Sequence, residues 1–263
     1  MDLGLKNKVA LVAAGSRGLG RAVAEELAAE GASLVLCARD AHTLDQTAAS
    51  IATNSNVNVL AVPADVTVTD DIKRVVETGI ERFGRIDILV TNAGGPPAGR
   101  FEQLTHEQWE EAIRLTLFSA IELTRLVLPG MKERRWGRIL NITSIAVKQP
   151  VDNLLLSNSL RAGLTGFART LANEVAADGI TVNNILPGYT RTERLDELAR
   201  MMSEKQGISA DEFRGRWEKE IPMGRLGEPR EFAALATFLV SERASYITGT
   251  SIQVDGGWIK SLL

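Results

Sequence analysis

Short apolar runs alternate along the chain with longer stretches in which apolar residues recur at the spacing of an amphipathic helix. Continuous apolar runs are typical of strands that are buried on both faces of a parallel sheet. The pattern predicts strands at residues 9–13, 33–38, 57–62, 86–91, 138–143, 180–186 and 251–254. It predicts helices at residues 22–30, 41–52, 69–83, 105–133, 154–177 and 229–240.

The order of these elements repeats a strand–helix unit almost to the end of the chain. Such repetition implies an α/β fold with a doubly wound parallel sheet of the Rossmann type. We find no linker, so we expect a single domain over residues 1–263. The charged stretch 191–220 has a helical pattern but is too polar for a core, and we expect it to form a lid beside the ligand crevice.

A glycine-rich turn separates the first predicted strand from the first predicted helix. Gly15, Gly18 and Gly20 follow the strand, and the helical pattern ends before Gly31. Glycine lets the backbone approach a phosphate closely, and the helix N-terminus offers free N–H groups. This arrangement indicates a dinucleotide site, although the glycines alone would also suit an ordinary turn.

Composition and charge narrow the classes of function. The 263 residues are 44% hydrophobic and carry a formal net charge of −3, which is typical of a soluble globular protein. Without a basic stretch for nucleic acid, a membrane-spanning apolar segment or a signal-peptide pattern, we expect a cytoplasmic protein. The one cysteine, Cys37, lies in an apolar run, which excludes an internal disulfide and indicates a packing role.

Five sequence motifs follow one another along the chain: residues 13–20, Asp65-Val66, Asn92-Ala93-Gly94, residues 187–192 and residues 249–257. In this order and at these spacings they resemble the classical short-chain dehydrogenase/reductase family, and most of all its 3-oxoacyl-acyl-carrier-protein reductase-like branch. The resemblance covers essentially the whole chain. It implies an oxidoreductase with a nicotinamide cofactor that acts on a carbonyl or hydroxyl substrate, of which a 3-oxoacyl thioester is one candidate.

The resemblance also implies which residues bind the cofactor. They are Gly15, Ser16, Arg17, Gly18, Leu19, Gly20, Arg39, Asp65, Val66, Asn92, Ala93, Gly94, Arg161, Pro187, Gly188, Thr190 and Thr192. By the same resemblance, Asp65 and Val66 contact the adenine and the Thr192 hydroxyl faces the carboxamide. Ala13 and Ala14 replace the Thr and the first Gly of the family's turn, and we expect Gly15 to supply the flexibility needed there.

Two arginines bear on the choice between NADP and NAD. Arg17 lies in the phosphate turn, and Arg39 follows the second predicted strand, where the adenosine ribose is expected. A guanidinium group favours a 2′-phosphate, whereas an acidic residue at this place favours the ribose hydroxyls of NAD. We therefore expect NADP and no metal ion, and Asp40 leaves NAD open.

The catalytic positions depart from the family's set of Asn, Ser, Tyr and Lys. Ser144 matches the serine, while Thr116, Ser157 and Arg161 stand at the positions of Asn, Tyr and Lys. A serine hydroxyl is a much weaker acid than a phenol, whose pKa is about 10. An arginine keeps its charge near neutral pH and does not transfer protons.

Two classes of function therefore stay open: an NADP-dependent oxidoreductase with altered proton transfer, and a nucleotide-binding relative that serves as a binding or assembly partner. Tyr189 and Lys148 are alternative proton donors, although we expect a structural or solvent-facing role for each. The resemblance also implies a homodimer or homotetramer that pairs through helices at residues 105–133 and 154–177. Apolar residues nearly encircle the first of these, which suits burial on two sides.

Overall fold

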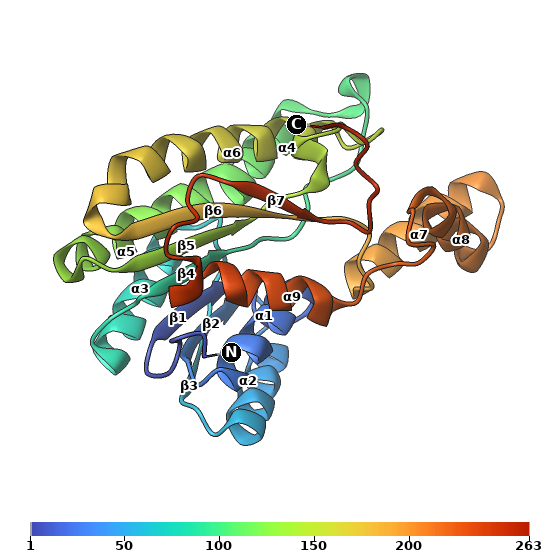
Figure 1. The fold of residues 1–263 in the computed structure, drawn as a ribbon. Coiled ribbons are helices and arrows are strands. Elements are labelled where there is room, and N and C mark those ends of the chain that lie inside the picture. Colours follow the sequence, from blue (N-terminus) through green and yellow to red (C-terminus); the bar gives the residue numbers. More distant parts are fainter. Residues whose placement is uncertain (1, 263) are drawn as a thin grey trace.

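The computed structural model describes residues 2–262, apart from the side chain of Lys205. Within this range the centre of the molecule is a parallel sheet with the strand order β3-β2-β1-β4-β5-β6-β7 (Figure 1). The strands are β1 (Val9–Ala13), β2 (Ser33–Ala38), β3 (Val59–Pro63), β4 (Ile88–Thr91), β5 (Gly137–Ile142), β6 (Ile180–Pro187) and β7 (Ser251–Val254). The strand order reverses between β1 and β4, so the predicted doubly wound α/β fold is confirmed.

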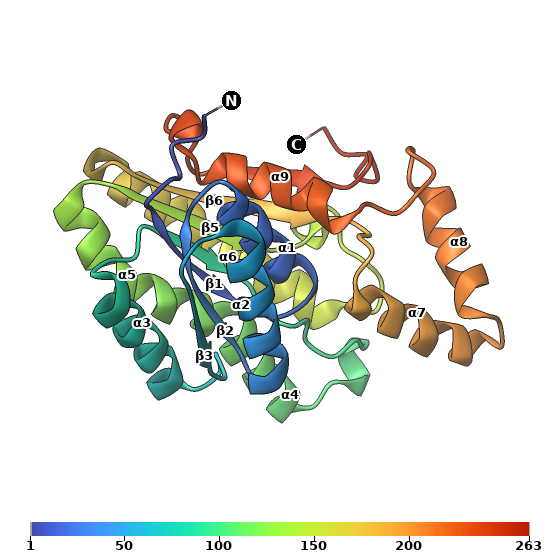
Figure 2. The same cartoon turned by 90° about the horizontal axis from the view of Figure 1, so that it is seen from below.

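Helices cover both faces of the sheet (Figures 1 and 2). One face carries α1 (Gly18–Ala29), α2 (Ala41–Ser55) and α9 (Pro229–Leu239). The other face carries α3 (Thr69–Phe83), α5 (Ser119–Arg134) and α6 (Leu155–Val175). Each face has its own apolar core. Among the helices of the described range, none combines the length and the apolar character that a membrane crossing requires.

Strand β1 explains why the predicted strands read as unbroken apolar runs. Ala10 and Val12 pack into the core beneath α1, α2 and α9, whereas Val9, Leu11 and Ala13 pack into the core on the opposite face. All of these side chains are buried. A strand between two helical layers has no solvent-facing side, so its sequence shows no alternation of apolar and polar residues.

The helix predicted over residues 105–133 is interrupted in the structure. The chain forms α4 (His106–Ile113), passes through a π-helical turn at Arg114–Phe118, and continues as α5. The backbone N–H of Ser119 donates to the Arg114 carbonyl, and the Ser119 hydroxyl donates to the Leu115 carbonyl at 2.5 Å. The extra residue of a π turn bends the ladder of hydrogen bonds, and such turns often occur at functional sites.

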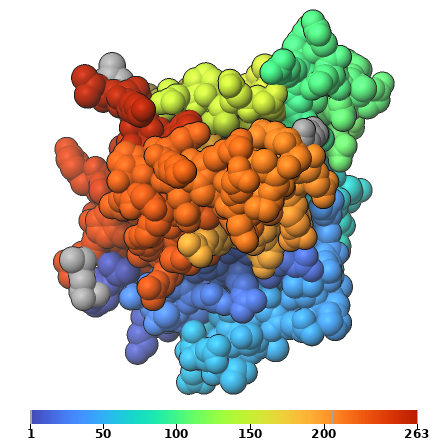
Figure 3. All heavy atoms as spheres, turned by 90° about the vertical axis from the view of Figure 1, so that its right-hand side faces the viewer, coloured from blue at the N-terminus to red at the C-terminus, as the bar shows by residue number. Residues whose placement is uncertain are grey.

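The charged segment predicted as a lid forms a hairpin of two helices, α7 (Glu193–Gln206) and α8 (Ala210–Glu220), which projects from the body (Figures 1 and 2). Phe213 and Trp217 of α8 pack with Ala199 of α7 in a small apolar cluster. In a surface view the hairpin forms a block over one side of the molecule (Figure 3). The segment thus lies outside the two sheet cores, as its polarity predicted, but it builds an apolar core of its own.

Candidate cofactor cleft and active site

The carboxyl ends of the parallel strands meet at one edge of the sheet, and the structure brings the predicted cofactor residues to this edge. Gly15, Ser16, Arg17, Gly18, Leu19 and Gly20 follow β1, Arg39 follows β2, Asp65 and Val66 follow β3, Asn92, Ala93 and Gly94 follow β4, and Gly188, Thr190 and Thr192 follow β6. In a doubly wound sheet, ligands bind at this edge where the strand order reverses.

The loop from β1 to α1 forms the candidate phosphate site. Helix α1 begins at Gly18, and the Arg17 side chain does not cap it, so the first N–H groups of the helix stay available to a ligand. Gly18 has a φ of 55°. A Cβ on Gly20 would lie 2.8 Å from Nδ2 of Asn92. These two positions therefore require glycine, one for its backbone angle and one for its close approach.

The expectation that Gly15 supplies the flexibility of this turn is wrong. Ala14 itself adopts the left-handed conformation, with a φ of 49°, and Gly15 is not among the residues with positive φ. Position 15 favours glycine for its close packing, because a Cβ there would lie 3.1 Å from both Cδ2 of Leu36 and the Val12 carbonyl oxygen. The turn is held from below by Thr47 of α2, whose hydroxyl donates to the Ser16 carbonyl at 3.0 Å.

Arg17 and Arg39 follow the ends of the neighbouring strands β1 and β2, where the adenosine is expected. Arg17 Nη2 donates to Thr43 Oγ1 at 2.9 Å and lies 3.4 Å from Asp40 Oδ2. Asp40 also caps α2 by accepting from the Thr43 backbone N–H. This hydrogen bond lowers the pKa of the Asp40 carboxyl, and the Thr43 hydroxyl and the nearby Arg17 lower it further. Arg39 is exposed and has no hydrogen-bond or ion-pair partner in the described part of the chain. Asp40 is thus engaged, and both arginines can face a ligand.

The ends of β3 and β4 continue the cleft. Asp65 Oδ1 accepts from the backbone N–H and the hydroxyl of Thr67, at 2.9 and 2.8 Å, and the Asp65 N–H donates to Asp71 Oδ2 at 2.7 Å. These bonds fix the loop beside the expected adenine position. Asn92 lies against Gly20 of the phosphate turn, so the ends of β1 and β4 are in direct contact.

Arg161 is hydrogen-bonded to Ser157 and to the backbone that leads into Ser144. Ser144 follows β5, and its Oγ accepts from the Ala146 backbone N–H at 3.1 Å. Ser157 and Arg161 stand one turn apart on α6, and Arg161 Nε donates to Ser157 Oγ at 3.2 Å. Arg161 Nη1 donates to the carbonyl oxygen preceding Ser144, that of Thr143, at 2.7 Å. The guanidinium therefore bridges the two serine-bearing elements.

Arg161 also ties α6 to the end of β5 through a second bond, from Nη1 to the Ile142 carbonyl at 2.9 Å. The sequence motif could not reveal these carbonyl contacts, although the four-residue spacing of Ser157 and Arg161 predicts that they share a helix face. Burial lowers the pKa of the Arg161 guanidinium to about 10, and no neighbouring carboxylate offsets this effect. Arg161 is therefore still positively charged at neutral pH.

Thr116 lies in the π-helical turn, facing a small cavity. Its Oγ1 is buried without a hydrogen-bond partner among the described residues. The cavity has a volume of about 10 Å³ and is lined by Thr91, Asn92, Ala93, Thr116, Ser119, Ala120, Ile142, Arg161 and Leu164. This volume is near the lower limit for one water molecule, and the unpaired hydroxyl offers it a polar contact.

The loop after β6 returns to the phosphate turn. The Gly188 N–H donates to the Val254 carbonyl at 2.9 Å, and a Cβ at Gly188 would lie 2.7 Å from Cα of Asp255, so glycine is required there. The Thr192 hydroxyl caps α7 by accepting from the Leu195 N–H at 3.3 Å. The Thr192 methyl faces Gly18. The structure therefore brings the lid and the phosphate turn together, and the Thr192 hydroxyl holds the lid's first turn.

The two alternative proton donors are both engaged elsewhere. The ring of Tyr189 stacks on Trp217 at 4.9 Å and meets Trp258 edge-on at 5.9 Å, measured between ring centroids. Burial in this cluster, with Glu220 nearby, raises the pKa of Tyr189 to about 12. Lys148 Nζ donates to Gln253 Oε1 at 2.8 Å. The structural role expected for Tyr189 agrees with this packing.

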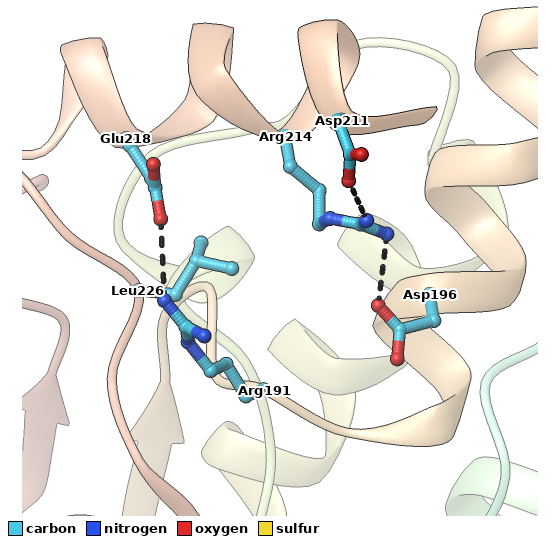
Figure 4. A pocket seen from close by; sticks show the side chains of 6 residues that line it. All are labelled: Arg191, Asp196, Asp211, Arg214, Glu218 and Leu226. Atoms are coloured by element: carbon cyan, nitrogen blue, oxygen red, sulfur yellow. Dashed lines mark hydrogen bonds and ion pairs between the residues drawn. The ribbon is translucent and has the colours of Figure 1, made fainter. Parts of the chain in front are cut away.

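A charged cavity of about 440 Å³ lies beneath the lid hairpin and was not predicted from the sequence (Figure 4). It is lined by Arg191, Asp196, Asp211, Arg214, Glu218 and Leu226. Arg214 bridges Asp196 of α7 and Asp211 of α8, and Arg191 lies 3.5 Å from Glu218. The ion pair of Arg214 with Asp196 joins the two lid helices across this cavity, and none of the predicted catalytic residues lines it.

Comparison with known proteins agrees with this fold. Residues 13–259 match the family model described as Enoyl-(Acyl carrier protein) reductase. The chain is 35% identical over 255 residues to the 3-oxoacyl-acyl-carrier-protein reductase FabG of Vibrio cholerae, covering 97% of this chain and 98% of that protein. It is 36% identical to FabG of Escherichia coli strain K12, again covering 97% of this chain and 98% of that protein.

Solved structures give the same assignment. L-sorbose reductase from Gluconobacter frateurii, complexed with NADPH and L-sorbose, superposes with a TM-score of 0.95 at 36% identity and 100% coverage of both chains. YwfH, an NADPH-dependent reductase involved in bacilysin biosynthesis, superposes with a TM-score of 0.93 at 28% identity, covering 97% of this chain and 99% of that one. The chain belongs to the classical short-chain dehydrogenase/reductase family of oxidoreductases and is similar to its FabG reductases.

Proposed function

We propose that this protein is an NADP(H)-dependent oxidoreductase that reduces a carbonyl group or oxidises the corresponding alcohol. The observation that carries the proposal is the pair of arginines beside the phosphate turn, Arg17 and Arg39, with Asp40 already engaged by Arg17 and the α2 cap. Two guanidinium groups at this place suit a 2′-phosphate. NADPH in the similar L-sorbose reductase supports the same cofactor.

The residues at the strand edge fit a dinucleotide, because no side chain caps the first N–H groups of α1 and these donors stay available to a phosphate. The turn at residues 15–20 and the N-terminus of α1 would hold the pyrophosphate. Residues 65–66 would hold the adenine, residues 92–94 would line that side of the crevice, and residues 187–192 would meet the nicotinamide end. When bound, the nicotinamide ring supplies or accepts a hydride.

The chain's own residues bind and orient the substrate. The Ser144 oxygen is fixed by the Ala146 N–H, so its hydroxyl hydrogen is left to donate to a substrate oxygen. Arg161 contributes a fixed positive charge. Neither Ser157 nor Arg161 releases a proton near neutral pH, so the proton comes from water. A reaction without a matched acid is slow, because a positioned acid or base contributes about 10²–10⁴-fold in rate.

A second candidate function is cofactor binding without turnover, in a binding or assembly role. The observation that favours it is the position of the two tyrosines. Tyr189 is packed in the lid cluster, and Tyr246 is 102% exposed. Neither phenol is joined to Ser144, Ser157 or Arg161 by a hydrogen bond in the described range.

One experiment separates these two functions. NADPH is titrated onto the protein, and NADPH oxidation is then screened over 3-oxoacyl thioesters and simple ketones. Oxidation with any carbonyl substrate supports the oxidoreductase. Binding with no oxidation across the screen supports the second function, and failure to bind NADPH rejects both.

The role of Ser157 is tested on any substrate that proves active. We expect Ser157→Ala to lower kcat less than tenfold, because a serine hydroxyl in this position cannot replace the phenol of the family's tyrosine. The measurement is steady-state turnover beside the unmodified protein. A loss of a hundredfold or more, which is the scale of a lost general acid–base group, would show that Ser157 is catalytic.

A further inference from the structure

Some of the N–H donors of Arg161 have no hydrogen-bond partner in the described part of the chain. A guanidinium group carries five N–H donors. Nε donates to Ser157 Oγ, and Nη1 donates to the carbonyls of Ile142 and Thr143. Nη2 makes no hydrogen bond within the described part of the chain. It is also not among the unpaired side-chain atoms that are buried from solvent there. Two N–H donors of a charged group are therefore left to an incoming ligand.

The hydroxyls of Ser144 and Ser157 also keep a donor that no other described residue uses. Ser144 Oγ accepts from the Ala146 N–H, and Ser157 Oγ accepts from Arg161 Nε. Neither hydroxyl donates a hydrogen bond to another described residue. Each oxygen already accepts one hydrogen bond, and its hydrogen remains to donate to a ligand. The site therefore presents the free N–H donors of Arg161 beside the O–H of Ser157, and the O–H of Ser144 one residue after the Thr143 carbonyl that Arg161 contacts.

No negative charge of the protein balances Arg161. None of the ion pairs of the described residues includes it, and only desolvation displaces its pKa from the ordinary value. Arg138, which is almost fully buried, is different: its Nη2 lies 3.6 Å from Glu242 Oε2. Arg161 is half-buried, and desolvation of a cation without a partner carries a cost that a ligand with the missing charge relieves.

We propose that the substrate of this site carries a carboxylate, which Arg161 Nη2 and the hydroxyls of Ser157 and Ser144 bind. This inference rests on the proposed function, since it names the class of substrate for the same site: an oxo acid or hydroxy acid. A carboxylate brings the missing charge and two oxygens that accept the donors left over by the protein. A neutral ketone or thioester leaves the charge of Arg161 uncompensated.

The test compares propionate with propionamide, which have nearly the same shape but differ in charge and carry no group that a nicotinamide ring reduces. Both are titrated onto the full chain by ligand-observed NMR, with and without saturating NADP⁺. We expect propionate to bind at least fivefold more tightly than propionamide in at least one of these states. Equal affinities in both states would overturn the proposal.

Three variants assign the preference to the site. Arg161→Gln removes the charge, and we expect the two affinities to become equal. Ser157→Ala keeps the bonds from Arg161 to the β5 carbonyls, so this variant serves if Arg161→Gln fails to fold. We expect it to bind propionate at least threefold more weakly and to bind propionamide as before. Arg82→Gln changes an exposed arginine of α3 and should keep the full preference. Loss of the preference in this control would overturn the assignment.

NADPH titrations of the same proteins separate this proposal from the proposed function. A protein that prefers propionate but does not bind NADPH keeps this site and refutes the proposed oxidoreductase. A protein that binds NADPH but shows no preference for propionate refutes the carboxylate site and leaves the proposed oxidoreductase standing. An Arg161→Gln variant that loses NADPH affinity but still prefers propionate would show that Nη2 serves the cofactor and would overturn the carboxylate site.

Discussion

At the scale of single residues, Ala14 adopts a backbone conformation that is unfavourable for alanine. Its φ of 49° lies in the left-handed region, where the Cβ crowds the backbone. The neighbouring Gly15 does not take up this conformation in place of Ala14, since Gly15 is not among the residues with positive φ. The phosphate turn is therefore formed at a local cost in stability.

We expect Ala14→Gly to raise the free energy of unfolding by about 0.5–1 kcal/mol. The left-handed conformation costs an L-residue about 1–2 kcal/mol, and the added entropy of an unfolded glycine offsets part of the gain. Urea denaturation measures the difference. The control is Ala13→Gly, in the buried strand β1, which should lose about 1 kcal/mol. A loss of stability in Ala14→Gly would contradict this account of the turn.

Arg39 is the residue on which the cofactor preference is tested. Calorimetry should show tighter binding of NADPH than of NADH in the unmodified protein. We expect Arg39→Asp to erase or invert that preference, because a carboxylate repels the 2′-phosphate and accepts from a ribose hydroxyl. Arg125→Gln, an exposed arginine paired with Glu122 on α5, serves as the control. Equal affinities for the two cofactors in the unmodified protein would refute the preference.

At the scale of elements, the lid is a hairpin with its own core. Trp217 is 7% exposed and stacks on Tyr189, which belongs to the loop after β6. The same loop contains Thr192, which caps α7 beside the phosphate turn. The lid is thus joined to the cleft through an aromatic contact and a helix cap, so the two are positioned to respond together.

We expect Trp217→Ala to loosen the hairpin without unfolding the sheet. The change removes the central ring of the lid cluster, and large buried aromatic truncations typically cost 3–5 kcal/mol locally. Amide hydrogen exchange over residues 193–220 should speed up at least tenfold, whereas exchange in β1, β4 and β5 should not change. Lys219→Ala, which changes an exposed residue of α8, is the matched control. Unchanged exchange in the hairpin would show that the cluster does not hold it.

At the scale of the whole molecule, the π-helical turn before α5 presents an apolar side chain to solvent. Phe118 is 52% exposed at the start of α5, while Leu123 further along the same helix is buried against the sheet. A helix with apolar residues on both sides suits packing against a second copy of the chain. Phe118 therefore offers a position at which the assembly expected from the sequence can be tested.

Light scattering at micromolar concentration should give a dimer or a tetramer. We expect Phe118→Glu to shift the protein toward the monomer, because it places a charge in the apolar contact. Ile80→Glu, which changes another exposed apolar helix residue with 42% exposure, should leave the assembly unchanged. A monomeric unmodified protein would contradict the expectation.

Much of the fold was predictable from the sequence, because local patterns specify it. Strands such as β1 read as unbroken apolar runs since both of their faces are buried, and helices such as α3 carry an apolar face at helical spacing. Parallel strands also place the residues after β1, β3 and β4 at one edge. The interrupted helix at Arg114–Phe118 was not predicted, because apolar periodicity does not distinguish a π turn from an α-helix.

The sequence by itself determined the sheet, the phosphate turn and the positions of Ser144, Ser157 and Arg161, because motifs and spacing are local properties of the chain. Only the tertiary structure decided how these residues are used. The guanidinium of Arg161 meets carbonyls 18 and 19 residues away in sequence, and the remaining donor, Nη2, is left over from those contacts. A side chain's free donors depend on which neighbours the fold supplies, and no spacing along the chain specifies them.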